Sequence, residues 1–170
     1  PLVTGVQTCA LPIFAFVKGI SQFLSPQGIW VFEMSYMPRM LELDSYDTIC
    51  HEHLEYYSLA VLEKILSRGG MKIFKISFNE INGGSIRCYA THKENNMYDS
   101  RADIDLISEI RHKEFDLELD TDKPYVAFQN RIEKLKIELN SLLVDLKKQG
   151  KKVHVYGAST KGNTILQWCG

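Results

Sequence analysis

The sequence predicts an α/β fold, because amphipathic helical stretches alternate with short apolar runs of strand length. Of its 170 residues, 45% are hydrophobic and 11% aromatic, enough to bury a core as one domain or as parts of two. Apolar residues at helical spacing run from residue 14 to 24, and residues 28–34 form a nearly all-apolar run. Such a run is typical of a central strand in a sheet that is covered on both faces.

The middle of the chain continues this alternation after a helical turn at residues 38–43. Ser58 is a suitable N-cap for a helix over residues 60–68, and two glycines end that helix. Residues 71–78 and 86–90 predict two strands, which we expect to form an antiparallel hairpin. The apolar face of the helix would consist of Val61, Leu62, Ile65 and Leu66.

The second half is richer in charge and in helices. Residues 126–149 predict a long packing helix. Residues 151–156 predict a new strand, which turns into a helix that begins near Asn163. Between the hairpin and the long helix, one amphipathic helix is predicted by the spacing of Ile104, Ile107, Ile110 and Phe115.

Charge and cysteine usage exclude several classes of protein. Twenty basic residues balance 21 acidic ones, so nothing indicates a nucleic acid or a membrane surface as partner. Apolar runs are too short to span a bilayer. Cys9, Cys50, Cys88 and Cys169 lie far apart without a CxxC pair, which favours reduced thiols and a cytoplasmic protein.

Residues 1–13 show neither helical nor strand periodicity. They resemble the conceptual translation of a sequencing-adapter oligonucleotide joined to a reading frame. We therefore interpret them as an assembly artefact and expect the native protein to extend upstream of Phe14.

Residues 47–58 combine acid–base groups with two tyrosines. His51 and His53 flank Glu52, and an imidazole can take or give a proton near neutral pH. From the residues alone three interpretations stay open: structural histidines, a metal site and a general base. If the stretch is a strand, His51 and His53 point to one face, where they could bind zinc with a third ligand from elsewhere.

Three further candidates each have a purely structural alternative. Glu33 stands near the end of an apolar run, where ligands of α/β sheets bind, but it could equally be a charge leaving the sheet. Residues 82–85 with Arg87 could approach and clasp a phosphate, or form a plain hairpin turn. Residues 156–164 could bind an anion at a helix N-terminus, or form a tight turn with a solvated Lys161.

Four stretches in a fixed order carry a resemblance to a known family: residues 46–58, residues 82–89, the long helix and residues 156–166. Together they resemble the S-adenosylmethionine-dependent C-methyltransferases that act on nucleotide-linked 4-keto-6-deoxy sugars. That family has an N-terminal zinc-binding module, a central class I methyltransferase domain with a Rossmann-like sheet, and a C-terminal Rossmann-like domain.

The resemblance implies a domain organisation. Residues 14–96 would be the C-terminal half of the class I methyltransferase domain, whose sheet ends in a reversed hairpin. Residues 97–170 would be a helical lead-in and the start of the second Rossmann-like domain. The zinc cysteines and the glycine-rich loop that holds S-adenosylmethionine would lie outside this sequence. We therefore expect this chain alone to be inactive.

The resemblance also implies roles for individual residues. His53 would be the general base that removes a proton next to the keto group, with Glu52 as its catalytic neighbour. Glu33 would contact the cofactor. The substrate would be bound by His51, Cys50, Tyr56, Tyr57, Gly84, Arg87, Tyr156, Lys161 and Asn163. Cys50 replaces a tyrosine that is common in the family, and no metal is expected at this site.

Two alternatives to this function remain at the level of sequence. One is a class I methyltransferase acting on another small molecule. The other is a non-catalytic domain that binds a nucleotide sugar.

Overall fold

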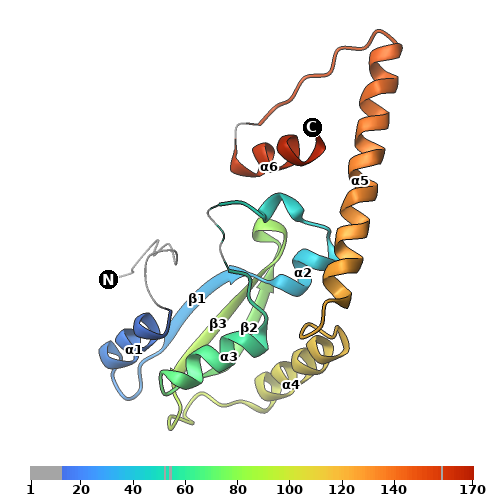
Figure 1. Cartoon of the computed structure of the whole chain (residues 1–170). Coiled ribbons are helices and arrows are strands. Elements are labelled where there is room, and N and C mark those ends of the chain that lie inside the picture. Colours follow the sequence, from blue (N-terminus) through green and yellow to red (C-terminus); the bar gives the residue numbers. More distant parts are fainter. Residues whose placement is uncertain (1–12, 52, 54, 158) are drawn as a thin grey trace.

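The computed structural model describes residues 13–51, 53, 55–157 and 159–170. It shows a three-stranded antiparallel sheet with helices packed on one face, and a long helix that extends away from them (Figure 1). The expected artefact, residues 1–13, lies outside the described residues except for Ile13, which begins the first helix.

The sheet has the order β1-β3-β2. β2 (Met71–Asn79) and β3 (Ser85–His92) form the predicted antiparallel hairpin, joined by the short 3-10 helix η3 (Ile81–Gly83). β1 (Trp30–Ser35) pairs antiparallel with β3 along its whole length. The hairpin therefore folds back so that its second strand lies between β1 and β2.

The prediction that residues 28–34 form a central strand buried on both faces does not hold within the described residues. β1 lies at an edge of the described sheet. Its side chains alternate: Trp30 and Phe32 pack against the core, whereas Val31 is 49% exposed. Successive side chains of a strand point to opposite faces, and the helices of the described chain cover one of them.

Three helices cover that face. α1 (Ile13–Phe23) packs against α3 (Leu59–Arg68), and both α3 and α4 (Arg101–Asp116) pack against β2. Ser58 caps α3 as predicted, because its Oγ accepts a hydrogen bond from the Val61 N–H at 3.3 Å. The centre of the core consists of Val17, Leu59, Leu66, Met71, Ile86, Cys88 and Ala90.

The buried face of α4 differs from the predicted one. Ile107 and Ile110 are buried as expected, but Ile104 is 49% exposed and Phe115 is 82% exposed. The third buried position is Glu114, which follows Ile110 by four residues and therefore lies on the same face of the helix. Phe115 is the next residue along the helix, so its side chain is rotated around the helix axis and points away from that face. Val61, also predicted to lie on an apolar helix face, is exposed, and so is Phe23 at the end of α1.

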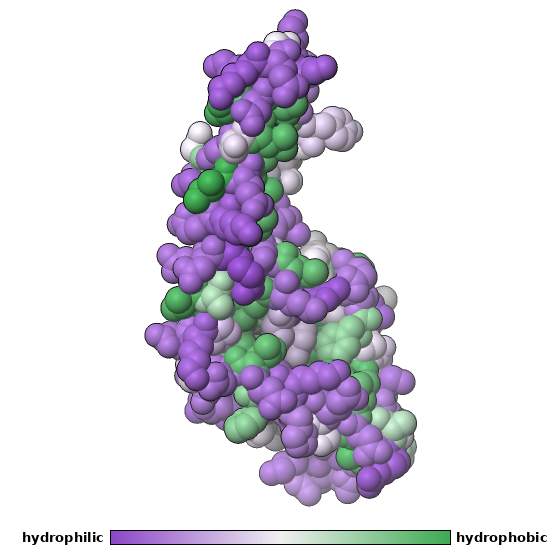
Figure 2. All heavy atoms as spheres, turned by 90° about the vertical axis from the view of Figure 1, so that its right-hand side faces the viewer, coloured by the Kyte–Doolittle hydropathy of each residue, from purple (hydrophilic) through white to green (hydrophobic). Residues whose placement is uncertain are grey.

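The long helix α5 (Lys123–Lys148) packs near its start against α2 (Met37–Glu42), where Phe128 and Ile132 are buried. Farther along, apolar side chains remain on the surface (Figure 2). α6 (Thr160–Cys169) returns to α5, and the amide of Asn140 donates to the Cys169 carbonyl at 3.0 Å.

The predicted strand at residues 151–156 is not formed. These residues are exposed, and within the described chain they pair with no strand. A strand needs hydrogen bonds to a neighbour, and the Lys151 N–H instead closes α5 by donating to the Leu146 carbonyl. The next helix begins at Thr160, earlier than predicted, because Ser159 caps it. None of the described helices is both long and apolar enough to cross a membrane.

Candidate functional site

The histidine-bearing stretch forms a loop whose two ends meet beside the end of β1. The chain leaves the sheet at Tyr36, passes through α2 and the 3-10 helix η2 (Tyr46–Thr48), and returns at Tyr57. There the Met37 N–H donates to the Tyr57 carbonyl at 2.9 Å, and Tyr36 and Tyr57 form an isolated parallel bridge. The loop is therefore closed at its base by backbone hydrogen bonding.

His53 is oriented by a backbone carbonyl. Its Nδ1 lies 2.9 Å from the Thr48 carbonyl oxygen, which also accepts a hydrogen bond from the Tyr56 hydroxyl at 3.2 Å. A carbonyl oxygen can only accept, so Nδ1 carries the proton and Nε2 of the neutral ring keeps its lone pair. Thr48 is 2% exposed, and its hydroxyl donates to the Ser45 carbonyl, so the acceptor is itself held in place.

The neighbouring residues form a turn. The His53 N–H donates to the Cys50 carbonyl at 3.0 Å, so the described part of this stretch is not the strand that the zinc alternative assumes. His51 lies in the same turn and is exposed, whereas Cys50 is half-buried. Glu52 lies outside the described residues. Among the residues described, no three histidine, cysteine or acidic side chains gather in a group able to hold a metal ion.

The two tyrosines of the stretch differ in their surroundings. Tyr57 is 7% exposed, and its hydroxyl donates to the carboxylate of Glu55. Burial, and then this carboxylate, raise the pKa of the Tyr57 hydroxyl. Tyr56 is half-buried beside Thr48, and burial raises its pKa as well. Both hydroxyls therefore stay protonated and can donate.

Glu33 and Arg87 were predicted to bind different ligands, and the structure brings them together. They are paired across β1 and β3, and Arg87 Nε lies 2.8 Å from Glu33 Oε2. Glu33 stands within β1, so its side chain lies over the open face of the sheet and not beyond the strand end. The role of Glu33 toward the cofactor and the role of Arg87 toward the substrate remain predictions.

Two features favour glycine at position 84: its backbone conformation and the close approach of Arg39. Its φ is +112°, and a Cβ built there would stand 2.2 Å from Cγ of Arg39. Its carbonyl accepts from the Tyr36 N–H at 3.1 Å, which joins the hairpin turn to the start of the histidine loop. Arg39 is held by Glu42 at 2.8 Å and Glu80 at 3.6 Å.

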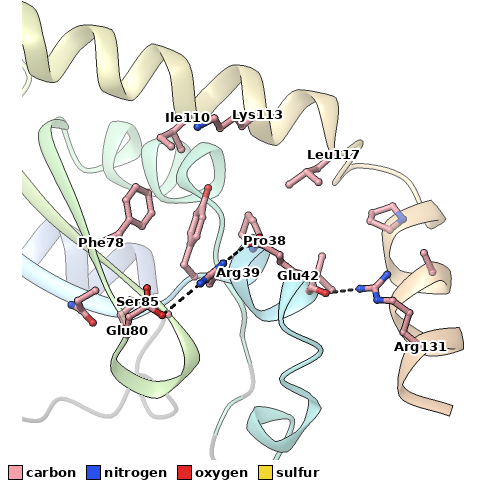
Figure 3. A pocket seen from close by; sticks show the side chains of 16 residues that line it. Pro38, Arg39, Glu42, Phe78, Glu80, Ser85, Ile110, Lys113, Leu117 and Arg131 are labelled. Carbon is pink, nitrogen blue, oxygen red and sulfur yellow. Dashed lines mark hydrogen bonds and ion pairs between the residues drawn. The ribbon is translucent and has the colours of Figure 1, made fainter. Parts of the chain in front are cut away.

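Gly84 and Arg39 border a cavity of about 800 Å³ between the hairpin, α2, α4 and the start of α5 (Figure 3). Its walls are largely apolar, with Phe78, Ile110 and Leu117 among them. Charged groups from several elements stand around it, including Arg39, Glu42, Glu80, Lys113 and Arg131.

The predicted anion-binding segment reaches the histidine loop through α6. Tyr156 and Asn163 are exposed, and Lys161 is half-buried in the first turn of α6. α6 packs against η2, where the rings of Tyr46 and Trp168 lie 6.5 Å apart. Burial, and then the Cys169 thiol, raise the pKa of Tyr46 to about 12.

Sequence reasoning missed three residues that shape this region: Thr48, Tyr36 and Glu114. The first acts through its carbonyl, which no sequence pattern reveals. Glu114 could have been found, because it stands seven residues after Ile107 on the apolar face of a helix. A carboxylate in such a position needs a buried partner.

Comparison with known proteins identifies the family to which the chain belongs. A sequence model of the C-methyltransferase C-terminal domain matches residues 80–170. Across 99% of its length, the chain is 29% identical to "C-methyltransferase NovU" of Streptomyces niveus. It covers 40% of the length of that curated relative.

The chain therefore belongs to the C-methyltransferase family whose C-terminal domain this match defines.

Proposed function

We propose that the chain is part of an enzyme that methylates carbon next to the keto group of a nucleotide-linked 4-keto-6-deoxy sugar. S-adenosylmethionine supplies the methyl group, and His53 is the general base. The family membership supports methyl transfer to carbon. The contact between His53 Nδ1 and the Thr48 carbonyl is the observation that carries the choice of base.

A base next to a ketone must present an unprotonated nitrogen to the substrate. Because Thr48 takes the proton-bearing Nδ1, Nε2 of His53 is the nitrogen available to accept the α-proton. The loop is closed at its base by the Tyr36–Tyr57 bridge, which limits the positions that the imidazole can adopt. Glu52 and His51 adjoin it in sequence, and we keep them as catalytic neighbour and substrate contact.

The cofactor would bind to the class I methyltransferase domain, of which this sequence would contain only the second half. The order β1-β3-β2, with a reversed hairpin, is what the end of a class I methyltransferase sheet would look like. Of the cofactor site, we assign to this chain only Glu33, which already has a cationic partner in Arg87. The methionyl part would be held by a glycine-rich loop, and zinc by a further module, outside these 170 residues.

The substrate's diphosphate requires an anion site, for which we propose the first turn of α6. Its N-terminal amides and the Lys161 ammonium carry positive charge, and Tyr156 and Asn163 flank them. α6 packs on η2, whose Thr48 orients His53, and the contact is made by Trp168 and Cys169 in the last turn of α6. Cys50, Tyr56, Tyr57, Gly84 and Arg87 complete the proposed substrate contacts. The widely separated cysteines support a reducing, cytoplasmic setting.

The test uses the full-length protein encoded by the uninterrupted reading frame that contains this sequence. Labelled S-adenosylmethionine and a nucleotide-linked 4-keto-6-deoxy sugar are supplied, and methyl transfer is measured. We expect transfer with the unaltered protein and a fall of about a hundredfold or more in His53→Gln. His112→Gln is the matched control, because His112 lies exposed on α4 and bonds to its own helix at Ser108.

A second measurement separates a base from a merely positioning residue. With S-adenosylhomocysteine in place of the methyl donor, the α-proton of the sugar should exchange with deuterated water, as followed by NMR. Exchange should be lost in His53→Gln and kept in the control. Wild-type exchange in His53→Gln would contradict the proposed role, and transfer to a different acceptor alone would favour the alternative substrate class.

A further inference from the structure

Glu114 is a buried carboxylate that reaches from α4 to the base of the histidine loop. The residue is 4% exposed. Its Oε1 accepts from the Tyr36 hydroxyl at 2.7 Å and from the Leu59 N–H at 2.6 Å, and its Oε2 accepts from the Ala60 N–H at 2.9 Å. A buried carboxylate with three donors is stabilised by charge-assisted hydrogen bonds.

Two of these donors belong to the N-terminus of α3. The first N–H groups of a helix have no partner within it, and the helix dipole favours a negative charge there. Glu114 takes the N–H groups of Leu59 and Ala60, and Ser58 takes that of Val61. A side chain 55 positions away in sequence thus completes the cap of the helix that follows the loop.

The third donor stands where the loop begins. Tyr36 is 8% exposed, its N–H donates to the Gly84 carbonyl, and its backbone is bridged to Tyr57. Burial, and then the hydrogen bond to Glu114, raise the pKa of its hydroxyl, which therefore remains a donor. One carboxylate consequently holds both Tyr36, where the chain leaves the sheet, and the first residues of α3, which follow the loop.

We propose that Glu114 is a positioning residue for His53, fixing the two ends of the loop that carries the imidazole. The catalytic consequence rests on the proposed function, whereas the effect on the loop does not. In this way α4, which lies far from the loop in sequence, would help to hold the base in position. Glu114 itself touches neither substrate nor base.

The first experiment measures the loop directly in the 170-residue protein. Histidine ring resonances are recorded by NMR at one pH for the unaltered protein, Glu114→Gln and Tyr36→Phe. We expect the His53 signal to shift or broaden in both variants, while that of His92, which bonds to the Leu24 carbonyl far from the loop, stays unchanged. Glu109→Gln is the matched control on the same helix, since Glu109 is exposed and pairs with Lys113.

Tyr36→Phe keeps the cap of α3 intact, so the test remains available if Glu114→Gln does not fold. A His53 signal identical to that of the unaltered protein in a folded variant that has lost the Glu114–Tyr36 contact would overturn the proposal. A role limited to stability predicts that outcome, with a lower melting temperature alone.

The second experiment uses the methyl-transfer assay of the continuous reading frame. We expect kcat to fall by about 10- to 100-fold in Glu114→Gln while KM for the methyl donor stays within about twofold, because a displaced base slows the chemical step. Unchanged kcat in this variant would contradict positioning. If His53→Gln retains full activity while the NMR shift is present, the proposed base is wrong and the contact between Glu114 and the loop still stands.

Discussion

Glu33 and Arg87 face each other across β1 and β3, and both Nε and Nη2 of Arg87 lie 2.8 Å from Oε2 of Glu33. Each charge therefore has a partner on the open face of the sheet. A ligand that recruits one of them must leave the other in water or contact both.

We expect Glu33→Gln and Arg87→Gln to lower the melting temperature less than Glu114→Gln. The pair is solvent-accessible, and exposed ion pairs contribute little, whereas Glu114 is buried with three donors. Thermal unfolding should also show that the effect of the double variant is smaller than the sum of the single ones. This gap between the double variant and the sum of the single variants should shrink in about 1 M salt, which screens exposed charges. A larger loss from Glu33→Gln than from Glu114→Gln would contradict this assignment.

Gly84→Ala should destabilise the protein more than Gly150→Ala. Both glycines have positive φ, at +112° and +71°, so both replacements place a side chain in a strained conformation. Only at position 84 does the added Cβ collide with Arg39, whereas position 150 is open. We expect a loss of about 1–3 kcal/mol for Gly84→Ala by urea unfolding. Equal losses at both positions would mean that Arg39 moves aside freely.

Cys88 should resist alkylation until the protein unfolds. It is fully buried in β3, and burial raises the pKa of its thiol to about 12. At pH 8 the reactive thiolate would therefore be a very small fraction of this thiol. Iodoacetamide labelling followed by peptide mass spectrometry should modify Cys50 and Cys169, which are half-buried, long before Cys88. In urea, Cys88 should react as fast as they do.

Lys161→Glu should weaken binding of the nucleotide sugar, if the first turn of α6 holds its diphosphate. The replacement puts a carboxylate beside the N–H groups that face the anion. The control is Lys147→Glu, an exposed lysine in the last turn of α5. Calorimetric titration of the protein from the continuous reading frame should show that Lys161→Glu alone lowers the affinity tenfold or more. A tenfold loss corresponds to roughly 1.4 kcal/mol of binding free energy. Equal affinity in both variants would remove Lys161 from the site.

Features that depend on neighbours in sequence were predicted correctly. The Ser58 cap, the helix that follows it and the hairpin of β2 and β3 arise from side-chain capping, helical spacing and turn residues within a few positions. The same local patterns placed His53 in a polar stretch between buried elements. The resemblance to C-methyltransferases also rested on such local stretches, and the family match bears it out.

What depended on distant partners could be found only in the folded chain. Within the described chain an apolar run became an edge strand because it pairs with β3 alone, and residues 151–156 stayed unpaired because no described strand lies beside them. The sequence alone determined that two histidines lie in this loop. Tertiary structure decided which ring nitrogen holds the proton, through Thr48, and which carboxylate anchors the loop, through Glu114. Hydrogen bonds are directional and short, so such choices depend on atoms that folding brings together.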